Sequence, residues 1–289
     1  MRLRTAIFGV LLFLQSALVL TGGAVRLTGS GLGCPTWPEC TPGSYTPVPY
    51  QAEGQLHAWI EFGNRLMTFA LLLSALIAVI YVLKSGREDL RSLAVGQVLG
   101  IFGQGVLGGI TVLTDLHPLP VAGHLLLSML LIAGATSLYS RRHGPHIKVS
   151  SPTKTVSLLS QTHIVISFIV LILGTIVTGS GPHAGDEKAQ RFGFDIRSVA
   201  ILHADAVIFL IGLTIALLVA ASITHSTKKA IYIFFGISLA QGGVGYAQYL
   251  TGIPELLVAI HLAGATIFWI AAWRIRLSIV RTSQQERDQ

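Results

Sequence analysis

The chain has 289 residues, of which 52% are hydrophobic and only 11% are charged, and the apolar residues come in long blocks. This composition is typical of a membrane protein. The formal net charge of +7 comes from basic residues at the edges of the blocks. It therefore indicates membrane topology and contact with anionic lipids rather than nucleic-acid binding.

A hydrocarbon core of roughly 30 Å needs about 20 apolar residues per helical span. Eight blocks approach this length between charged residues or Gly/Pro clusters, which predicts an all-α protein with eight transmembrane helices. The predicted spans are 5–25, 62–83, 92–114, 121–140, 156–178, 199–223, 230–250 and 256–273. The first block is interpreted as a retained helix, because no small-residue cleavage site precedes Arg26.

The distribution of basic residues predicts the orientation, because Lys and Arg are retained on the cytoplasmic side of short loops. Fifteen of the 20 Lys and Arg residues lie in the two termini and in the second, fourth and sixth loops. Both termini are therefore predicted to be cytoplasmic. These residues are Arg2, Arg4, Lys84, Arg87, Arg91, Arg141, Arg142, Lys148, Lys154, Lys228, Lys229, Arg274, Arg276, Arg281 and Arg287.

The sequence contains an internal repeat. A shift of 137 residues places the third and fourth blocks on the seventh and eighth without a gap, and the TGSG string at 28–31 recurs at 178–181. The superposed residues include Gln104 and Gln241, Gly108 and Gly245, and His124 and His261. The repeat predicts two tandem four-helix bundles, 1–148 and 149–289, related by a pseudo-two-fold axis along the membrane normal.

Histidines inside membrane spans usually face a functional cavity or a partner. His203 and His261 lie near the outer starts of the sixth and eighth spans, at similar depth in one bundle. Facing histidines on neighbouring helices can supply both axial ligands of a heme iron. The pair therefore predicts a heme site in the C-terminal half, and two hydrogen-bonded packing histidines are the alternative.

The N-terminal half is predicted to hold an asymmetric counterpart of this site. His124 matches His261, but Asn64 stands where His203 would be expected. Asn is a poor ligand for heme iron, and an open axial position favours chemistry over electron transfer. Glu61 lies one turn before Asn64 and could shuttle protons, while an ion pair with Arg65 is its structural alternative.

Three further features stand out: TGGAVRLTGSGLGCPTWPEC at 21–40, EFGNR at the opening of the second span, and histidines at the starts of the fourth, sixth and eighth spans. In these features the chain resembles the heme A synthase family, of an actinobacterial-like type with one cysteine pair. The resemblance implies a heme b held by His203 and His261, and an N-terminal half that oxidises a methyl group of heme O to a formyl by successive hydroxylations. Glu61 then matches the family's functional acid and His124 its substrate-side histidine.

Several residues near the substrate site have more than one interpretation. Asn64 replaces a histidine found in many family members. His57 lies about 10 Å from it along the same helix face and could ligate only if the helix start unwinds. Arg26 and Arg65 are candidate partners of the heme propionates. Cys34 and Cys40 are predicted to form a disulfide in the first outer loop, with a structural or a redox role.

The resemblance implies a bacterial cell membrane location, with heme O synthase and cytochrome c oxidase assembly factors as partners. The alternative function is a diheme b-type electron carrier, which would need two bis-ligated hemes, and Asn64 argues against it. A heme or small-solute transporter is a third possibility, but its broken helices are expected at mid-membrane.

Overall fold

The structure is a computed structural model that describes residues 2–144, 153–220 and 225–285. These residues form eight α-helices, each long and apolar enough to cross a membrane, which confirms the predicted fold class. The helices are α1 (Arg2–Leu27), α2 (Gln55–Lys84), α3 (Glu88–Leu113), α4 (Pro118–Ser140), α5 (Lys154–Ser180), α6 (Ile196–Val219), α7 (His225–Leu250) and α8 (Glu255–Gln285). Lys148, Arg287, the predicted end of the sixth span at 223 and the predicted boundary at 148/149 lie outside the described residues.

Two helices extend well beyond their predicted spans. α2 begins at Gln55 rather than at 62, so EFGNR lies inside the helix, and α8 runs to Gln285 rather than to 273. Hydropathy marks only the apolar part of a helix, whereas backbone hydrogen bonds continue into the polar interface. The N-cap of α2 is Gly54, whose φ of 90° is readily adopted only by glycine.

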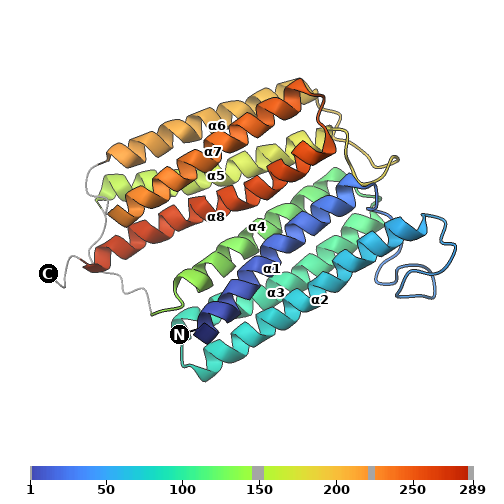
Figure 1. Cartoon of the computed structure of the whole chain (residues 1–289), viewed down its shortest axis with the longest axis horizontal. Coiled ribbons are helices and arrows are strands. Elements are labelled where there is room, and N and C mark those ends of the chain that lie inside the picture. Colours follow the sequence, from blue (N-terminus) through green and yellow to red (C-terminus); the bar gives the residue numbers. More distant parts are fainter. Residues whose placement is uncertain (1, 145–152, 221–224, 286–289) are drawn as a thin grey trace.

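The helices form two groups, α1–α4 and α5–α8, that lie side by side (Figure 1). In each group, consecutive helices are in contact and the first helix also contacts the fourth. α2 and α4 are therefore diagonal to each other across their group, as are α6 and α8. The two groups meet through α1, α4, α5 and α8. The repeated contact pattern fits the predicted pseudo-two-fold axis, which itself stays a prediction.

The interface between the groups is closely packed. Trp269 Nε1 donates to the Met129 carbonyl at 2.6 Å, and Trp273 Nε1 donates to Ser137 Oγ at 2.7 Å. Gly23 of α1 leaves room for the side chain of Leu262 on α8. Lipid provides little hydrophobic drive for helix association, so such hydrogen bonds and small-residue contacts hold transmembrane helices together.

Both termini lie at one end of the molecule, and the two long loops, 28–54 and 181–195, lie at the other (Figure 1). We call this second end the loop end. The candidate site residues on α2, α4, α6 and α8 all lie in the parts of these helices nearest the loop end.

Candidate functional site

His203 on α6 and His261 on α8 face each other across the diagonal of the second group. Their ring centroids are 6.5 Å apart, and the ring planes are inclined by 70°. Two imidazoles that bind one metal at about 2 Å each need ring centroids about 6 Å apart. The separation therefore fits a heme iron held between the two rings.

The surroundings of these rings favour a ligand role over a packing role. His203 lies against Gly174, where an added Cβ would be 3.4 Å from the ring Cε1 atom. His261 lies against Gly245, where an added Cβ would be 3.5 Å from Cε1. The buried Nδ1 of His261 makes no hydrogen bond to the described residues. A packing histidine looks different: His163 is fully buried and its Nε2 lies 3.2 Å from Thr214 Oγ1.

His124 repeats the setting of His261 in the first group. Its ring lies against Gly108, where an added Cβ would be 3.3 Å from Cε1, and its buried Nδ1 also makes no hydrogen bond within the described part of the chain. Gln104 Nε2 donates to the His124 carbonyl at 3.1 Å, and Gln241 Nε2 donates to the His261 carbonyl at 2.8 Å. The sequence repeat is thus also a repeat of contacts.

Asn64 on α2 has surroundings like those of His203. It lies against a glycine of the preceding helix, because a Cβ on Gly22 would be 3.9 Å from Asn64 Nδ2. Thr21 Oγ1 donates to Asn64 Oδ1 at 2.7 Å. The first group therefore presents a fixed amide where the second presents an imidazole. Thr21 opens the string at 21–40 that carries the family resemblance, but nothing in that string predicts its hydrogen bond to Asn64.

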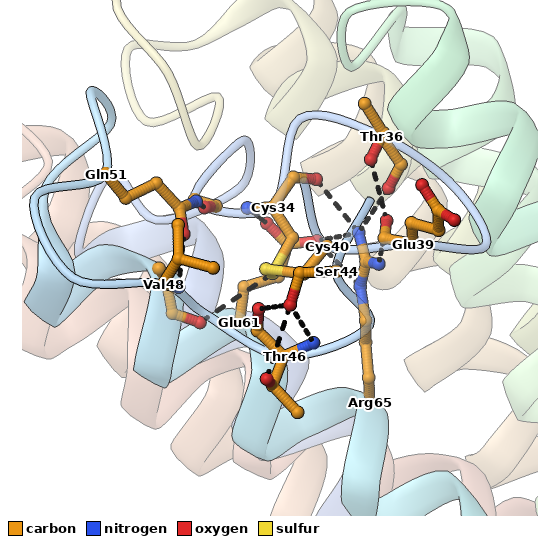
Figure 2. Close-up of a disulfide and its surroundings, with 12 residues drawn as sticks. Cys34, Thr36, Glu39, Cys40, Ser44, Thr46, Val48, Gln51, Glu61 and Arg65 are labelled. Atoms are coloured by element: carbon orange, nitrogen blue, oxygen red, sulfur yellow. Dashed lines mark hydrogen bonds and ion pairs between the residues drawn. A yellow bond between two sulfur atoms is a disulfide. The ribbon is translucent and has the colours of Figure 1, made fainter. Parts of the chain in front are cut away.

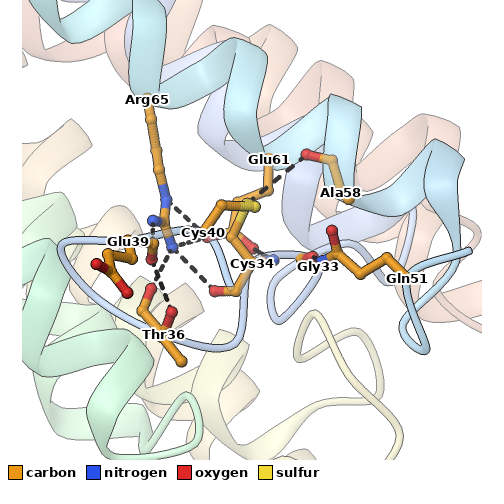
Figure 3. Close-up of polar contacts among 9 residues, drawn as sticks. All are labelled: Gly33, Cys34, Thr36, Glu39, Cys40, Gln51, Ala58, Glu61 and Arg65. Atoms are coloured by element: carbon orange, nitrogen blue, oxygen red, sulfur yellow. Dashed lines mark hydrogen bonds and ion pairs between the residues drawn. A yellow bond between two sulfur atoms is a disulfide. The ribbon is translucent and has the colours of Figure 1, made fainter. Parts of the chain in front are cut away.

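Glu61 has an almost fully buried side chain, 6% exposed, one turn before Asn64. Its Oε1 accepts from Arg65 Nε at 3.1 Å and Arg65 Nη2 at 2.6 Å, and its Oε2 accepts from the Cys34 backbone N–H at 2.8 Å (Figure 3). The ion pair considered for Glu61 is therefore present. The paired charge explains how a carboxylate can lie buried at this depth.

Arg65 connects α2 to the first loop. Besides Glu61, its guanidinium donates to the backbone carbonyls of Cys34 at 2.9 Å, Thr36 at 3.1 Å and Glu39 at 3.2 Å (Figures 2 and 3). These contacts turn the guanidinium towards the loop. Backbone acceptors carry no side-chain signature, so these partners could not be predicted from the sequence.

Cys34 and Cys40 form the predicted disulfide, and both are completely buried (Figure 2). The five residues between them in the chain include Trp37, which packs on α3. A Cβ on Gly109 would lie 2.6 Å from Trp37 Cδ2. The disulfide loop, residues 34–44, is thus held to α2 by Glu61 and Arg65 and to α3 by Trp37.

Two other candidates also contact loop residues. His57 lies within α2, so the helix start is not unwound, and its Nδ1 is 3.0 Å from Ser30 Oγ. Arg26 donates to the backbone carbonyls of Thr178, at 2.8 Å, and of His183. Arg26 therefore ties the end of α1 to the loop of the other group.

Comparisons with known proteins agree with this architecture. A family model described as COX15-CtaA, cytochrome oxidase assembly protein, matches residues 5–185. Similar proteins named heme A synthase include one from Sinorhizobium fredii, 24% identical over 92% of this chain and 87% of its own length. A heme A synthase from Rhizobium leguminosarum is 25% identical over 92% of this chain and 88% of its own length. One from Shewanella oneidensis is 27% identical over 86% of this chain and 88% of its own length.

Proposed function

Because the chain belongs to the COX15-CtaA family of cytochrome oxidase assembly proteins, we propose that it is a heme A synthase, which oxidises a methyl group of heme O to the formyl group of heme A. The observation that carries this proposal is the facing pair His203 and His261, at a separation that fits one iron. The proposed cofactor is therefore a heme b in the C-terminal half. When bound, this heme supplies one-electron redox chemistry, by which electrons can leave or reach the substrate site.

The reaction needs two successive hydroxylations of one carbon. The first converts the methyl to a hydroxymethyl, and the second gives a geminal diol that loses water to leave the formyl. Each hydroxylation is a two-electron oxidation that replaces one C–H bond of this carbon by a C–O bond; with O2 as the oxidant, the second oxygen atom takes up two electrons and two protons from a donor and leaves as water. The protein's part is to position the substrate, to exclude bulk water and to move protons.

The first group of helices provides residues for these tasks. His124 lies against Gly108, whose missing side chain leaves room for the imidazole ring, and is proposed as the residue that holds the substrate heme. Glu61, one turn from Asn64, is the nearest buried carboxylate on α2 and is proposed to hold and pass on a proton at its Oε atoms. Arg65 and the Cys34 N–H hold that carboxylate in place.

The proposed setting is a bacterial cell membrane, with both termini in the cytoplasm. The bias of Lys and Arg towards the termini and the second, fourth and sixth loops supports this orientation. The loop end, with Cys34 and Cys40, would then face the oxidising side, where disulfides persist. The proposed partners are a heme O synthase that supplies the substrate and assembly factors of cytochrome c oxidase that receive the product.

Co-expression with a heme O synthase tests the proposed activity. The extracted hemes would be compared by chromatography and mass between the intact chain and His203→Ala. We expect heme A, or its hydroxylated precursor, only with the intact chain. If a well-folded intact chain yields heme b and unconverted heme O alone, the chain is the diheme electron carrier instead.

A further inference from the structure

We propose that the substrate heme has one axial protein ligand, His124, and that Asn64 donates a hydrogen bond to the reactant bound on the opposite, open side. This inference rests on the proposed function, because it concerns the same heme O site. Beyond the proposed activity, it states that the open position binds a small diatomic or oxygen-containing ligand. The C-terminal site, with two imidazoles, has no such position.

The first step is that Asn64 occupies the place opposite His124. α2 and α4 are diagonal in their group, as α6 and α8 are in theirs. Each of the four positions faces a glycine of a neighbouring helix: Asn64 faces Gly22, His124 faces Gly108, His203 faces Gly174 and His261 faces Gly245. Since His203 and His261 meet across one diagonal, Asn64 and His124 are expected to meet across the other.

The second step is that Asn64 is not arranged as an iron ligand. Carboxamide oxygen suits hard cations such as Mg²⁺ and Ca²⁺, whereas imidazole suits iron. In addition, Asn64 Oδ1 already accepts the Thr21 hydroxyl at 2.7 Å. Nδ2 makes no hydrogen bond to the described residues and remains a free donor. The amide therefore has N–H groups left to donate to a ligand at the site.

The third step is that α2 offers no replacement histidine. The other histidine of α2 is His57, about two turns away, and its ring is held beside Ser30 Oγ at 3.0 Å. Glu61 is closer to Asn64, but it is a carboxylate rather than an imidazole, and Arg65 and the Cys34 N–H hold it in place. The position opposite His124 is therefore left open to a small molecule.

Carbon monoxide binding to the reduced protein tests this arrangement, because carbon monoxide needs an open axial position. The full chain would be co-expressed with a heme O synthase, purified without oxygen, and assayed for total heme and for bound carbon monoxide per chain. We expect one carbon monoxide for each occupied N-terminal site. Asn64→His should lower carbon monoxide affinity at least tenfold and give a second low-spin heme spectrum.

Two further variants separate the role of Asn64 from a folding effect. Asn64→Leu should still bind carbon monoxide, but with a higher C–O stretching frequency, because the bound ligand loses its hydrogen-bond donor. Thr21→Val should also shift this frequency, since it frees the amide to rotate. An unchanged frequency in Asn64→Leu would overturn the role given to Asn64.

The coordination itself is overturned if wild-type protein with both hemes bound takes up no carbon monoxide. If His57→Ala then restores uptake, His57 is the second ligand. The pigments extracted from the same cells report the activity separately. Carbon monoxide uptake without heme A would contradict the proposed function alone, and heme A formed by a protein that cannot bind carbon monoxide would contradict the coordination alone.

Discussion

At the scale of single residues, Glu61 combines a position in the candidate site with a contact that holds the outer loop. Its carboxylate lies one turn from Asn64 and accepts hydrogen bonds from Arg65 and from the Cys34 N–H. A change of this residue can therefore act on chemistry, on the loop or on both. A neutral side chain of the same shape separates these effects, because it still accepts the Cys34 N–H.

We predict that Glu61→Gln lowers heme O conversion about 100-fold or more, while the chain keeps its C-terminal heme b. The reason is that an amide cannot carry the proton that a carboxylate can, and positioned acid–base groups contribute roughly 10²–10⁴-fold. Heme A formation and the heme b spectrum measure the two effects. Glu39→Gln, the same chemical change within the disulfide loop, is the control. Loss of all heme in Glu61→Gln would mean that the residue is structural.

We predict that His261→Ala abolishes the low-spin heme b spectrum, because one ring cannot hold the iron as two do. The heme content and visible spectrum of the purified protein measure this loss. His225→Ala, at the exposed start of α7, is the control and should keep the spectrum. An unchanged spectrum in His261→Ala would remove the C-terminal heme site from the proposal.

The sequence predicted some of these residues and their contacts but not others. His124 and His261 could be predicted because the repeat carries them in an ungapped match, and their matching contacts with Gln104 and Gln241 agree with it. The partners of Arg65 and Arg26 could not be predicted, since both guanidinium groups bind backbone carbonyls of residues distant in the chain.

At the scale of elements, α2 and the disulfide loop form one unit. The apolar pattern predicted the membrane part of α2 but missed its first seven residues, because Gln55, His57 and Glu61 interrupt the apolar run there. The disulfide could be predicted from two nearby cysteines in an outer loop. Its burial could not, since it depends on Glu61 and Arg65 drawing the loop onto the helix.

The burial of Cys34 and Cys40 favours a structural role, because thiol–disulfide exchange needs access to a sulfur atom. We predict that Cys34→Ser combined with Cys40→Ser loosens the loop by about 2 kcal/mol, as expected for so short a closed loop. Proteolysis within 29–54 should become faster, and heme O conversion should fall but persist. Complete loss of conversion, with an intact heme b site, would indicate the redox role instead.

The contact between Trp37 and α3 provides a second test of this unit. We predict that Gly109→Ala displaces Trp37 and speeds proteolysis of the loop, because the added Cβ has no space beside the indole. Gly105→Ala lies one turn away on α3 and meets nothing within 4 Å, so it serves as the matched control. Equal proteolysis of the two variants would show that Trp37 does not anchor the loop.

At the scale of the whole molecule, the larger apolar core crosses between the two groups. It contains Val19, Met129, Ile132 and Ala133 of the first group together with residues of α5 to α8. The repeat predicted two similar halves but not this shared core. A repeat shows which residues correspond, whereas the packing between halves depends on side-chain shapes that differ between them.

We therefore predict that separately encoded halves, 1–148 and 149–289, assemble when they are co-expressed. The shared core and the tryptophan hydrogen bonds to Met129 and Ser137 should hold them together. Co-purification of a tagged half with the untagged one measures assembly. The heme b spectrum shows whether the assembled halves have the same heme site as the intact chain. If the second half alone bound heme b with equal stability, the shared core would not contribute to that site.

The disulfide loop also bears on the order of events during synthesis. Its polar partners Ala58, Glu61 and Arg65 all belong to α2, so they are complete once the first two helices have entered the membrane. We expect the cysteines to be oxidised while the ribosome is still making the rest of the chain, and only the contact of Trp37 with Gly109 has to wait for α3. The outer cover of the site would then exist before His203 and His261, the proposed heme b ligands, have been translated.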